Sequence, residues 1–337
     1  MALCRRAFFW VLAGAFLLGP ALSFALDIGG IEYISVAQFA RISGMKYKTV
    51  ERAKQMVVFD KYQTSSFKTH SRVARVNGYF INLGHPVAAD KFGMLYLSKR
   101  DAYRNLFPVL FPYSLKNARR PFHIVIDAGH GGKDNGAVNK RYGVKEKTVN
   151  LDIALRLGAI LKARGFKVSY TRVKDVFIEL EHRPVVANKL RADLFISVHS
   201  NSAANNSVGG IETYALTPVW LPSSSSDKLR KSDTVAYPGN GVDGWSQLLS
   251  HSIQRALVDY AKASDRGARR ARFAVLRTAN MPACLVEVGY LSNSAECLKL
   301  AKADYRQKIA EAIAGGIAAY SSTARKTAER EAAKRKK

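Results

Sequence analysis

The sequence predicts an α/β fold for its larger part, with a mostly parallel twisted sheet and helices on both faces, preceded by a small α+β module. Three observations favour this fold. After Pro121, strand-like apolar runs alternate with amphipathic helical segments, which is typical of a parallel sheet covered by helices. Pro108, Pro112 and the polar stretch 113–121 separate this part from the residues before it. The length of 337 residues and the hydrophobic content of 47% suit one large core or two smaller ones.

Residues 1–25 have the composition of a secretory signal peptide. Arg5 and Arg6 precede an apolar run, and small residues fit a cleavage after Ala25. The run is short for a membrane span, which needs about 20 residues, and Pro20 breaks it. We therefore expect secretion across the inner membrane, to the periplasm or cell envelope, rather than a retained anchor.

Residues 26–112 are expected to form the small α+β accessory module. Ser35 can cap a short helix that Gly44 ends, and Asn77-Gly78 is a strong hairpin signal between two strands. We expect helices over Val36–Ser43 and Lys99–Leu106 and strands over Gln55–Phe59, Ser71–Val76, Tyr79–Leu83 and Met94–Leu97. No side chains of the module have catalytic spacing, so its role stays open.

The basic stretch 113–121 is expected to be a linker, and residues 122–320 are expected to form the second domain. Its first helical segment carries its apolar residues on one face, and Gly165 ends that helix. We expect strands over 122–127, 166–171, 193–198, 210–216, 273–276 and 283–288, and helices over 148–163, 180–190, 244–261 and 304–320.

An insertion over residues 217–241 is rich in serine, proline and glycine. This composition predicts a loop rather than a long helix. Two roles stay open for it: a solvated loop, or the wall of a binding groove with Trp220 and Tyr237 as stacking surfaces.

The chain is strongly basic, with a formal net charge of +27. Such a charge implies a partner rich in anions, whether a wall or outer-membrane polymer, an anionic lipid or a nucleic acid. No aromatic-interleaved basic motif or finger spacing accompanies it, so we expect no specific nucleic-acid binding. The basic tail, 321–337, has seven basic and two acidic residues and is expected to be a frayed helix extension or a disordered arm.

Cys284 and Cys297 are the cysteines that remain after removal of the signal peptide. In an oxidising compartment they can pair. They also fit the interpretation of two small buried hydrophobic residues, and both interpretations stay open.

Three predicted strands end at side chains that can bind a metal or move protons: His130, His199 and Glu287. Ligands collect outside the carboxyl ends of strands in α/β sheets, so these side chains are expected to share one site. A hydrolytic zinc site takes three protein ligands and leaves one position for water, and the best third ligand is Glu146, at the start of a helix. Taken singly, each histidine can instead form a hydrogen bond with a loop. Glu146 can instead stabilise the N-terminus of its helix as a carboxylate.

Five segments carry the recognisable motifs of the second domain. They are Ile124–Ala137, Lys145–Leu151, Leu180–Asn188, Leu194–Asn201 and Met281–Asn293. In this order they resemble the zinc-dependent N-acetylmuramoyl-L-alanine amidases of the family-3 type (Amidase_3). The resemblance implies that 122–320 is the zinc amidase catalytic domain, that His130, Glu146 and His199 are the Zn2+ ligands, and that Glu287 is the catalytic glutamate. The implied substrate is peptidoglycan, cut between N-acetylmuramic acid and L-alanine during cell-wall remodelling or daughter-cell separation.

The chemistry of an amide explains why four such groups are wanted. Zinc can polarise the carbonyl and bring bound water toward a pKa of about 7, and Glu287 can take the water proton and pass it to the leaving nitrogen. As a purely structural group, Glu287 would be costly in an apolar strand without a partner. The alternative function is non-catalytic binding of peptidoglycan or another anionic polymer, which loss of one site residue would favour. Whether an activator protein is needed stays open.

Overall fold

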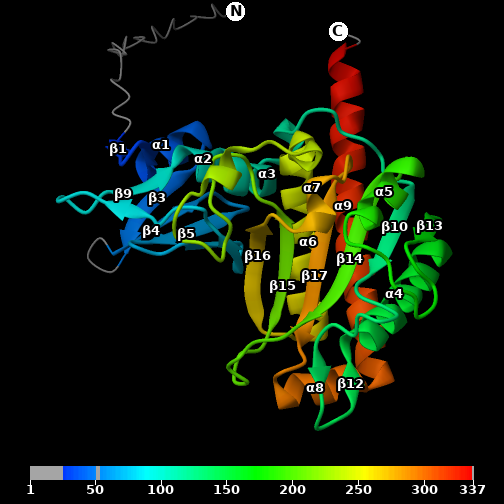
Figure 1. Cartoon of the computed structure of the whole chain (residues 1–337). Coiled ribbons are helices and arrows are strands. Elements are labelled where there is room, and N and C mark those ends of the chain that lie inside the picture. Colours follow the sequence, from blue (N-terminus) through cyan, green and yellow to red (C-terminus); the bar gives the residue numbers. More distant parts are fainter. Residues whose placement is uncertain (1–25, 51–53, 336–337) are drawn as a thin grey trace, which may run out of the picture.

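The structure, a computed structural model, describes residues 26–50 and 54–335, and the expected signal peptide lies outside them. One sheet of eleven strands runs through the described residues, in the order β13-β10-β14-β17-β15-β16-β7-β6-β5-β4-β3 (Figure 1). In this order, the first six strands, which end with β16, belong to the second domain, and the last five, which begin with β7, belong to the module. Among the described residues, no helix combines the length and the apolar character that crossing a membrane requires.

The half of the sheet formed by the second domain is mostly parallel, as predicted. Strands β13, β10, β14 and β17 run parallel, β15 runs antiparallel to β17, and β16 runs parallel to β15. Every residue of β10 is buried, as expected for a strand covered on both faces. The strands are β10 His123–Ala128, β13 Lys167–Tyr170, β14 Leu194–Asn201, β15 Ile211–Leu216, β16 Asp265–Ala271 and β17 Ala283–Tyr290.

Helices cover both faces of this half of the sheet. α4, α6, α8 and α9 pack on one face, in a core that includes Ile126, Leu157 and Ile313. α5 and α7 pack on the other face, in a core with Phe195 and Leu276. The helices are α4 Glu146–Ala163, α5 His182–Lys189, α6 Asp243–Ala261, α7 Ala274–Arg277, α8 Ser294–Ala301 and α9 Ala303–Arg335. Because β10, β14 and β17 are parallel, their carboxyl ends meet at one edge of the domain.

One predicted strand is wrong. Residues 274–277 form the short helix α7, and the strand lies earlier, at β16, which the sequence analysis did not assign. The sequence of β16, Asp-Arg-Gly-Ala-Arg-Arg-Ala, lacks the apolar alternation that marks most strands. Its buried Arg270 donates instead to the carbonyl oxygens of Arg104 and Leu216 and to Asn105 Oδ1. Polar partners on neighbouring elements therefore stabilise β16, although its own sequence does not predict a strand.

The module is a small α+β unit, and its capping and turn signals are confirmed. Ser35 Oγ accepts a hydrogen bond from the N–H of Gln38 at 3.0 Å, and Asn77 and Gly78 turn with φ of 50° and 93°. The helix that begins at Lys99 is longer than predicted, because a π-helical segment continues it to α3. The module contains β1 Leu26–Ile28, β2 Ile31–Ser35, α1 Val36–Ile42, β3 Lys46–Val50, β4 Gln55–Phe59, β5 Thr64–Lys68, β6 Val73–Val76, β7 Tyr79–Asn82, β8 Ala88–Ala89, β9 Leu95–Ser98, α2 Lys99–Asp101, η1 Ala102–Leu106 and α3 Phe107–Leu110.

The module and the second domain share the long sheet at the junction of β7 and β16. Ile81 of β7 pairs with Ala268 of β16, and both are fully buried. The backbone N–H of Phe80 donates to Asp265 at 2.9 Å. From the insertion, the carbonyl oxygen of Ser226 accepts a hydrogen bond from Arg72 of the module at 2.7 Å. The stretch 113–121 is therefore one of several connections between the two parts.

The C-terminal residues continue the last helix. α9 was expected to end at Tyr320, but it runs to Arg335 with Ala324 and Thr327 buried. Arg330 lies 3.8 Å from the ring centroid of Tyr113, in the stretch 113–121. Residues 321–335 are therefore not a separate basic tail. Of the two alternatives, the helix extension is the one observed. Residues 336 and 337 lie outside the described residues. The buried positions 313, 317, 320, 324 and 327 recur every three or four residues, which is the spacing of one helical face.

The two cysteines of the second domain are free thiols, and both are buried. They belong to the core between the sheet and α4, α6, α8 and α9. The interpretation as small buried hydrophobic residues is the one observed.

Candidate metal centre

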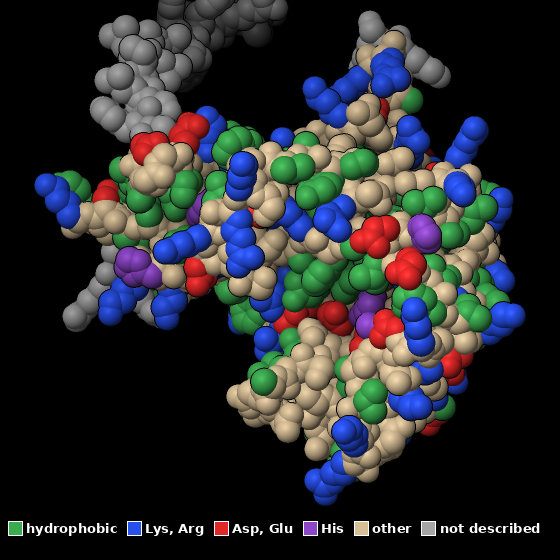
Figure 2. Space-filling model, in the orientation of Figure 1, with side chains coloured by type: hydrophobic (Ala, Val, Ile, Leu, Met, Phe, Trp, Pro, Cys, Tyr) green, Lys and Arg blue, Asp and Glu red, His purple; other side chains and the backbone are tan. Residues whose placement is uncertain are grey.

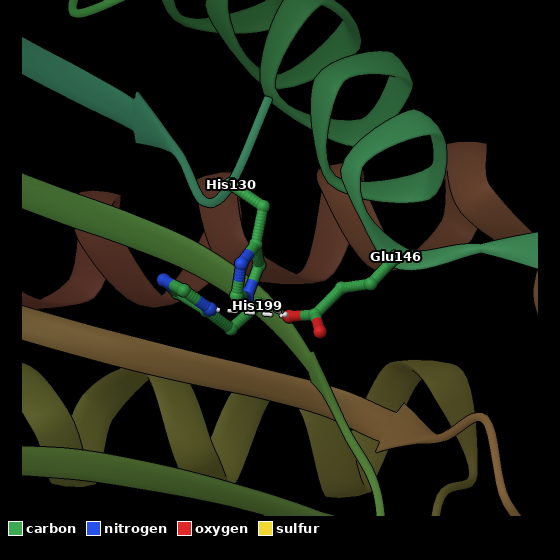
Figure 3. Close-up of side chains that lie close together, drawn as sticks. All are labelled: His130, Glu146 and His199. Carbon is green, nitrogen blue, oxygen red and sulfur yellow. Dashed lines mark hydrogen bonds and ion pairs between the residues drawn. The ribbon is translucent and has the colours of Figure 1, made fainter. Parts of the chain in front are cut away.

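The three predicted ligands come from separate elements and converge at the carboxyl edge of the parallel strands (Figure 3). His130 follows β10, His199 lies near the end of β14, and Glu146 begins α4, after a hairpin of β11 (Val138–Asn139) and β12 (Val144–Lys145). One nitrogen from each imidazole and one carboxylate oxygen all lie within 4.8 Å of one another. Such a cluster of two imidazoles and one carboxylate suits a divalent metal ion with an open position.

Glu146 is held as an ionised carboxylate. Its Oε1 lies 3.1 Å from His130 Nε2 and 3.1 Å from His199 Nδ1. Its Oε2 accepts a hydrogen bond from the N–H of Ala137 at 2.7 Å, and Oε1 accepts one from Ser200 at 3.0 Å. Burial acts to raise the pKa of this carboxyl, but the hydrogen bonds and charges of the two histidines outweigh it and hold the pKa well below its usual range. The hydrogen bonds that the Glu146 carboxylate accepts come from Ala137, Ser200 and the side chain of Asn150, so it is oriented for the site and not for the helix end.

His130 is positioned by its own loop. Its backbone adopts a left-handed φ of 61°, which is uncommon for a residue with a side chain. Asp134 Oδ2 lies 2.7 Å from His130 Nδ1, which leaves Nε2 facing the site. A Cβ atom at Gly129 would collide with the imidazole of His199, so that position requires glycine. Asp134 was not predicted, although it follows His130 by four residues in the same glycine-rich loop.

Glu287 lies beside the ligands but pairs with none of them. It is in register with His199 on the neighbouring strand. Its Oε2 is buried and has no hydrogen-bond partner within 26–50 and 54–335. Burial, with the charges of Glu146 and Glu212, raises the pKa of Glu287 well above its usual range. An unpaired carboxyl with a raised pKa in a reachable site is typical of a proton-transfer group.

The site can be reached from solvent. Figure 2 shows histidine and acidic side chains together in a hollow of the surface, with hydrophobic side chains beside them. The side chain of His130 is 22% exposed and that of His199 is 12% exposed. A small ligand can therefore approach both imidazoles.

Residues 124–319 match the family described as N-acetylmuramoyl-L-alanine amidase. The chain belongs to this family. It is 33% identical over 222 residues to the amidase AmiC of Escherichia coli O6:H1, a match that covers 60% of this chain and 53% of that protein. It is also 33% identical over 220 residues to AmiA of Escherichia coli K12, which covers 58% of this chain and 75% of that protein.

A solved structure has the same fold as the second domain. The N-acetylmuramoyl-L-alanine amidase from Clostridium difficile 630 superposes with a TM-score of 0.51 at 32% identity, over 60% of this chain and 97% of that chain. The chain spans about half the length of AmiC of Escherichia coli O6:H1. The family match covers the four predicted site residues, His130, Glu146, His199 and Glu287.

Buried charges support the loop that carries His130 in this family member. Arg183 and Asp127 are almost wholly buried and pair at 2.9 Å. Arg183 also donates to the carbonyl oxygens of Ala128 and His130, at 2.9 and 3.1 Å. Arg172, which the sequence analysis did not single out, donates to the carbonyl oxygens of Ala128 and Gly129, both at 2.8 Å. These contacts of Arg183 and Arg172 fix the backbone of the loop.

Glu212 is a second buried carboxylate that sequence reasoning missed. It lies opposite Glu287 in the register of β15 and β17. It accepts hydrogen bonds from Arg266 at 2.5 Å, Arg269 at 2.6 Å and the hydroxyl of Tyr290 at 2.9 Å. Burial acts to raise the pKa of Glu212, but the charge of Arg269 and the hydrogen bonds hold it below its usual range. The arginines of β16 were the available signal, but that strand was not recognised.

The two aromatic residues of the insertion point to different neighbours. Trp220 lines a cavity of about 440 Å³ with Lys99 and Tyr103 of the module. Tyr237 packs against the core formed with α5 and α7, and Arg277 lies 5.5 Å from its ring centroid. The insertion is therefore folded onto the body of the protein, and a role of Trp220 and Tyr237 in stacking on substrate stays a prediction.

Proposed function

We propose that this protein is a zinc-dependent hydrolase that cleaves the amide bond between N-acetylmuramic acid and L-alanine in peptidoglycan. The observation that carries the proposal is the convergence of His130, Glu146 and His199 beside the unpaired Glu287. Membership of the amidase family supports the same reaction and the same substrate.

Two imidazole nitrogens and one carboxylate oxygen are the donor set that zinc takes in hydrolytic sites, so His130, Glu146 and His199 would hold it. When bound, zinc polarises the amide carbonyl, lowers the pKa of water and, as a cation near Glu287, favours the ionised form of that carboxyl. Asp134 keeps Nε2 of His130 turned to the site, and Arg183 and Arg172 fix the loop that carries it.

Glu287 has the proton-transfer role in the proposed reaction. Its carboxylate accepts a proton from the attacking water while the water oxygen bonds to the carbonyl carbon. The same carboxyl then gives the proton to the leaving nitrogen as the carbon–nitrogen bond breaks. The products are a free lactyl carboxylate on the sugar and a free amino group on L-alanine. A carboxyl whose pKa is raised by burial holds that proton long enough to deliver it.

We also propose a location and a broader partner. Residues 1–25 would direct the protein across the inner membrane to the periplasm or cell envelope, where peptidoglycan is found. The net charge of +27 would attract the protein to anionic wall or outer-membrane polymers.

Incubation of purified residues 26–337 with isolated peptidoglycan tests the reaction. The expected products are stem peptides with a free N-terminal L-alanine and glycan with intact lactyl carboxylates, identified by mass spectrometry. A chelator should abolish their release, and added zinc should restore it. Binding to peptidoglycan without release of peptide, with zinc present, would support the non-catalytic alternative.

A further inference from the structure

One face of the long sheet continues from the metal centre across the second domain. His199 lies opposite Glu287, and Glu287 lies opposite Glu212. Two residues further along β15, Tyr214 lies opposite Arg269 of β16. Paired residues on adjacent strands point to the same face, and so do residues two apart on one strand. These five side chains therefore share one face of the sheet.

The same face continues into the module. Ala268 and Ile81, paired across the junction, are fully buried on the core side, so their neighbours Arg269 and Phe80 lie on the opposite, open face. Further strands extend the row: Arg75 lies opposite Phe80, and Ser66 lies opposite Arg75. The strands of the two parts belong to one sheet, and in Figure 1 the module lies beside β16. The proposed catalytic residues and the open face of the module thus belong to one continuous surface.

A basic groove lies on this surface beside the junction. It has a volume of about 560 Å³, and its charged lining residues are Lys68, Arg75, Arg266, Arg269 and Asp265. Asp265 already accepts hydrogen bonds from the backbone of the junction, so the groove presents mainly positive charge. The guanidinium of Arg75 lies over the ring of Phe80, 4.7 Å from its centroid.

Lys68 and Arg75 are available to bind an anion. Both are exposed, and neither forms an ion pair within the described ranges 26–50 and 54–335. Arg266 and Arg269, by contrast, are already paired with Glu212. The positive charges of the groove that no carboxylate balances therefore lie in the part that the module contributes.

We propose that this groove binds the stem peptide of the substrate, with peptide carboxylates on Lys68 and Arg75. The proposal rests on the proposed function. In intact peptidoglycan the lactyl carboxyl is bound in the scissile amide and the N-acetylated sugars are neutral, so the fixed negative charge of the substrate is on the peptide. A basic groove continuous with the site therefore suits the peptide side of the scissile bond and not the glycan side.

The dimensions of the sheet define which part of the stem peptide reaches Lys68 and Arg75. At about 4.8 Å per strand spacing, the four spacings from β17 to Arg75 on β6 span roughly 19 Å, and the five spacings to Lys68 on β5 span roughly 24 Å. An extended peptide advances about 3.4 Å per residue, so roughly six to seven residues cover these distances. Lys68 and Arg75 are thus placed for the distal carboxylates of a stem peptide or of a peptide crosslinked to it, beyond the reach of L-alanine alone.

The variant K68Q/R75Q tests the groove in the full-length zinc-loaded protein. Its KM for a soluble muramoyl peptide with a complete stem should rise about three- to ten-fold at low salt, with kcat changed less than two-fold, because only exposed charge contacts are lost. On N-acetylmuramoyl-L-alanine the variant and the wild type should behave alike. The difference on the long substrate should vanish near 1 M salt, where the Debye length is about 3 Å.

A matched control removes the same charge from the opposite side of the molecule. Lys308 and Lys326 are exposed on α9, which covers the other face of the sheet. K308Q/K326Q should leave the KM for the long substrate unchanged, and R75K should retain most of the wild-type affinity. An unchanged KM in K68Q/R75Q, or an equal rise in the control, would overturn the proposal.

A binding measurement separates this proposal from the proposed function. If the wild type hydrolyses neither substrate, the proposed function fails. Calorimetric titration of the stem peptide alone into wild type and K68Q/R75Q still tests the groove. Equal affinities, or no binding by the wild type, would exclude it, whereas weaker binding by the variant would support it.

Discussion

The two halves of the long sheet hold their charged side chains in different ways. In the second domain, Asp127 and Arg183 are almost wholly buried and pair with each other. In the module, Lys68 and Arg75 are exposed on the open face. A buried pair is expensive to break, whereas an exposed charge contributes little to stability. The buried pair of the second domain thus fixes the geometry of the site, while the exposed charges of the module can contribute affinity without constraining the fold.

The largest effect is expected from loss of a metal ligand. His199→Ala should lose bound zinc and activity together, because two ligands compete poorly for the ion. Zinc content by atomic absorption and turnover on a soluble muramoyl peptide measure the two losses. The exposed histidine variant His182→Ala is the control and should retain both. Full zinc stoichiometry in His199→Ala would refute the ligand assignment.

Loss of the proton acceptor should come next. Glu287→Gln should keep its zinc and lower turnover by about 10²- to 10⁴-fold, because an amide cannot accept the water proton. Its thermal stability should equal or exceed that of the wild type, since the buried Oε2 of Glu287 has no partner to lose. Glu181→Gln, at an exposed position, serves as control. Near-normal turnover in Glu287→Gln would show that another group acts as the base.

Breaking the buried pair tests the comparison on stability. Arg183→Met leaves Asp127 buried without its cation, so the free energy of unfolding should fall by about 3–5 kcal/mol. Arg75→Gln on the module's open face should change it by less than about 0.5 kcal/mol. Urea denaturation measures both. If the two substitutions lowered the free energy of unfolding by similar amounts, the buried pair of the second domain would contribute no more to stability than an exposed charge of the module.

A smaller effect is expected at the C-terminus. Removal of residues 321–337 exposes the surface that Ala324 and Thr327 bury and removes the contact of Arg330 with Tyr113. The free energy of unfolding should fall by about 1–3 kcal/mol. The variant K334Q/R335Q, which removes charge and keeps the packing, should unfold at the wild-type temperature in a thermal scan. An unchanged stability of the truncated protein would restore the expectation of an independent basic arm.

The sequence was most informative where a residue of the site lies at the end of a strand. His130, His199 and Glu287 could be predicted to converge because parallel strands bring their carboxyl ends to one edge, a property of topology rather than of exact register. Glu146 could be added because its helix returns from the His130 loop. The same reasoning did not single out Arg172, although it follows β13, because its guanidinium contacts backbone carbonyl oxygens of the loop and no side chain that the sequence marks as a ligand.

The sequence was least informative where partners come from distant parts of the chain. β16 was missed because the environment of Arg270 is created by Arg104 and Leu216, far away in sequence. Glu212 was missed for a related reason, since its arginine partners lie on that unrecognised strand. The sharing of one sheet by the two parts depends on β7 pairing with β16, and no local pattern encodes that pairing. The extension of α9 was one of the two alternatives left open for the tail, and the helical spacing of its buried residues was the signal that could have decided between them.

The pairing of β7 with β16 also concerns the solubility of the chain. Without the module, β16 would be the last strand of its sheet, and an uncovered edge strand offers a row of free backbone donors and acceptors to another molecule. The module covers that edge and moves the end of the sheet to β3, a strand with the residues Lys46, Tyr47, Lys48, Thr49 and Val50. Lysines on an edge strand oppose the addition of a further strand. The accessory part thereby protects the sheet that carries the metal centre from edge-to-edge association with another molecule.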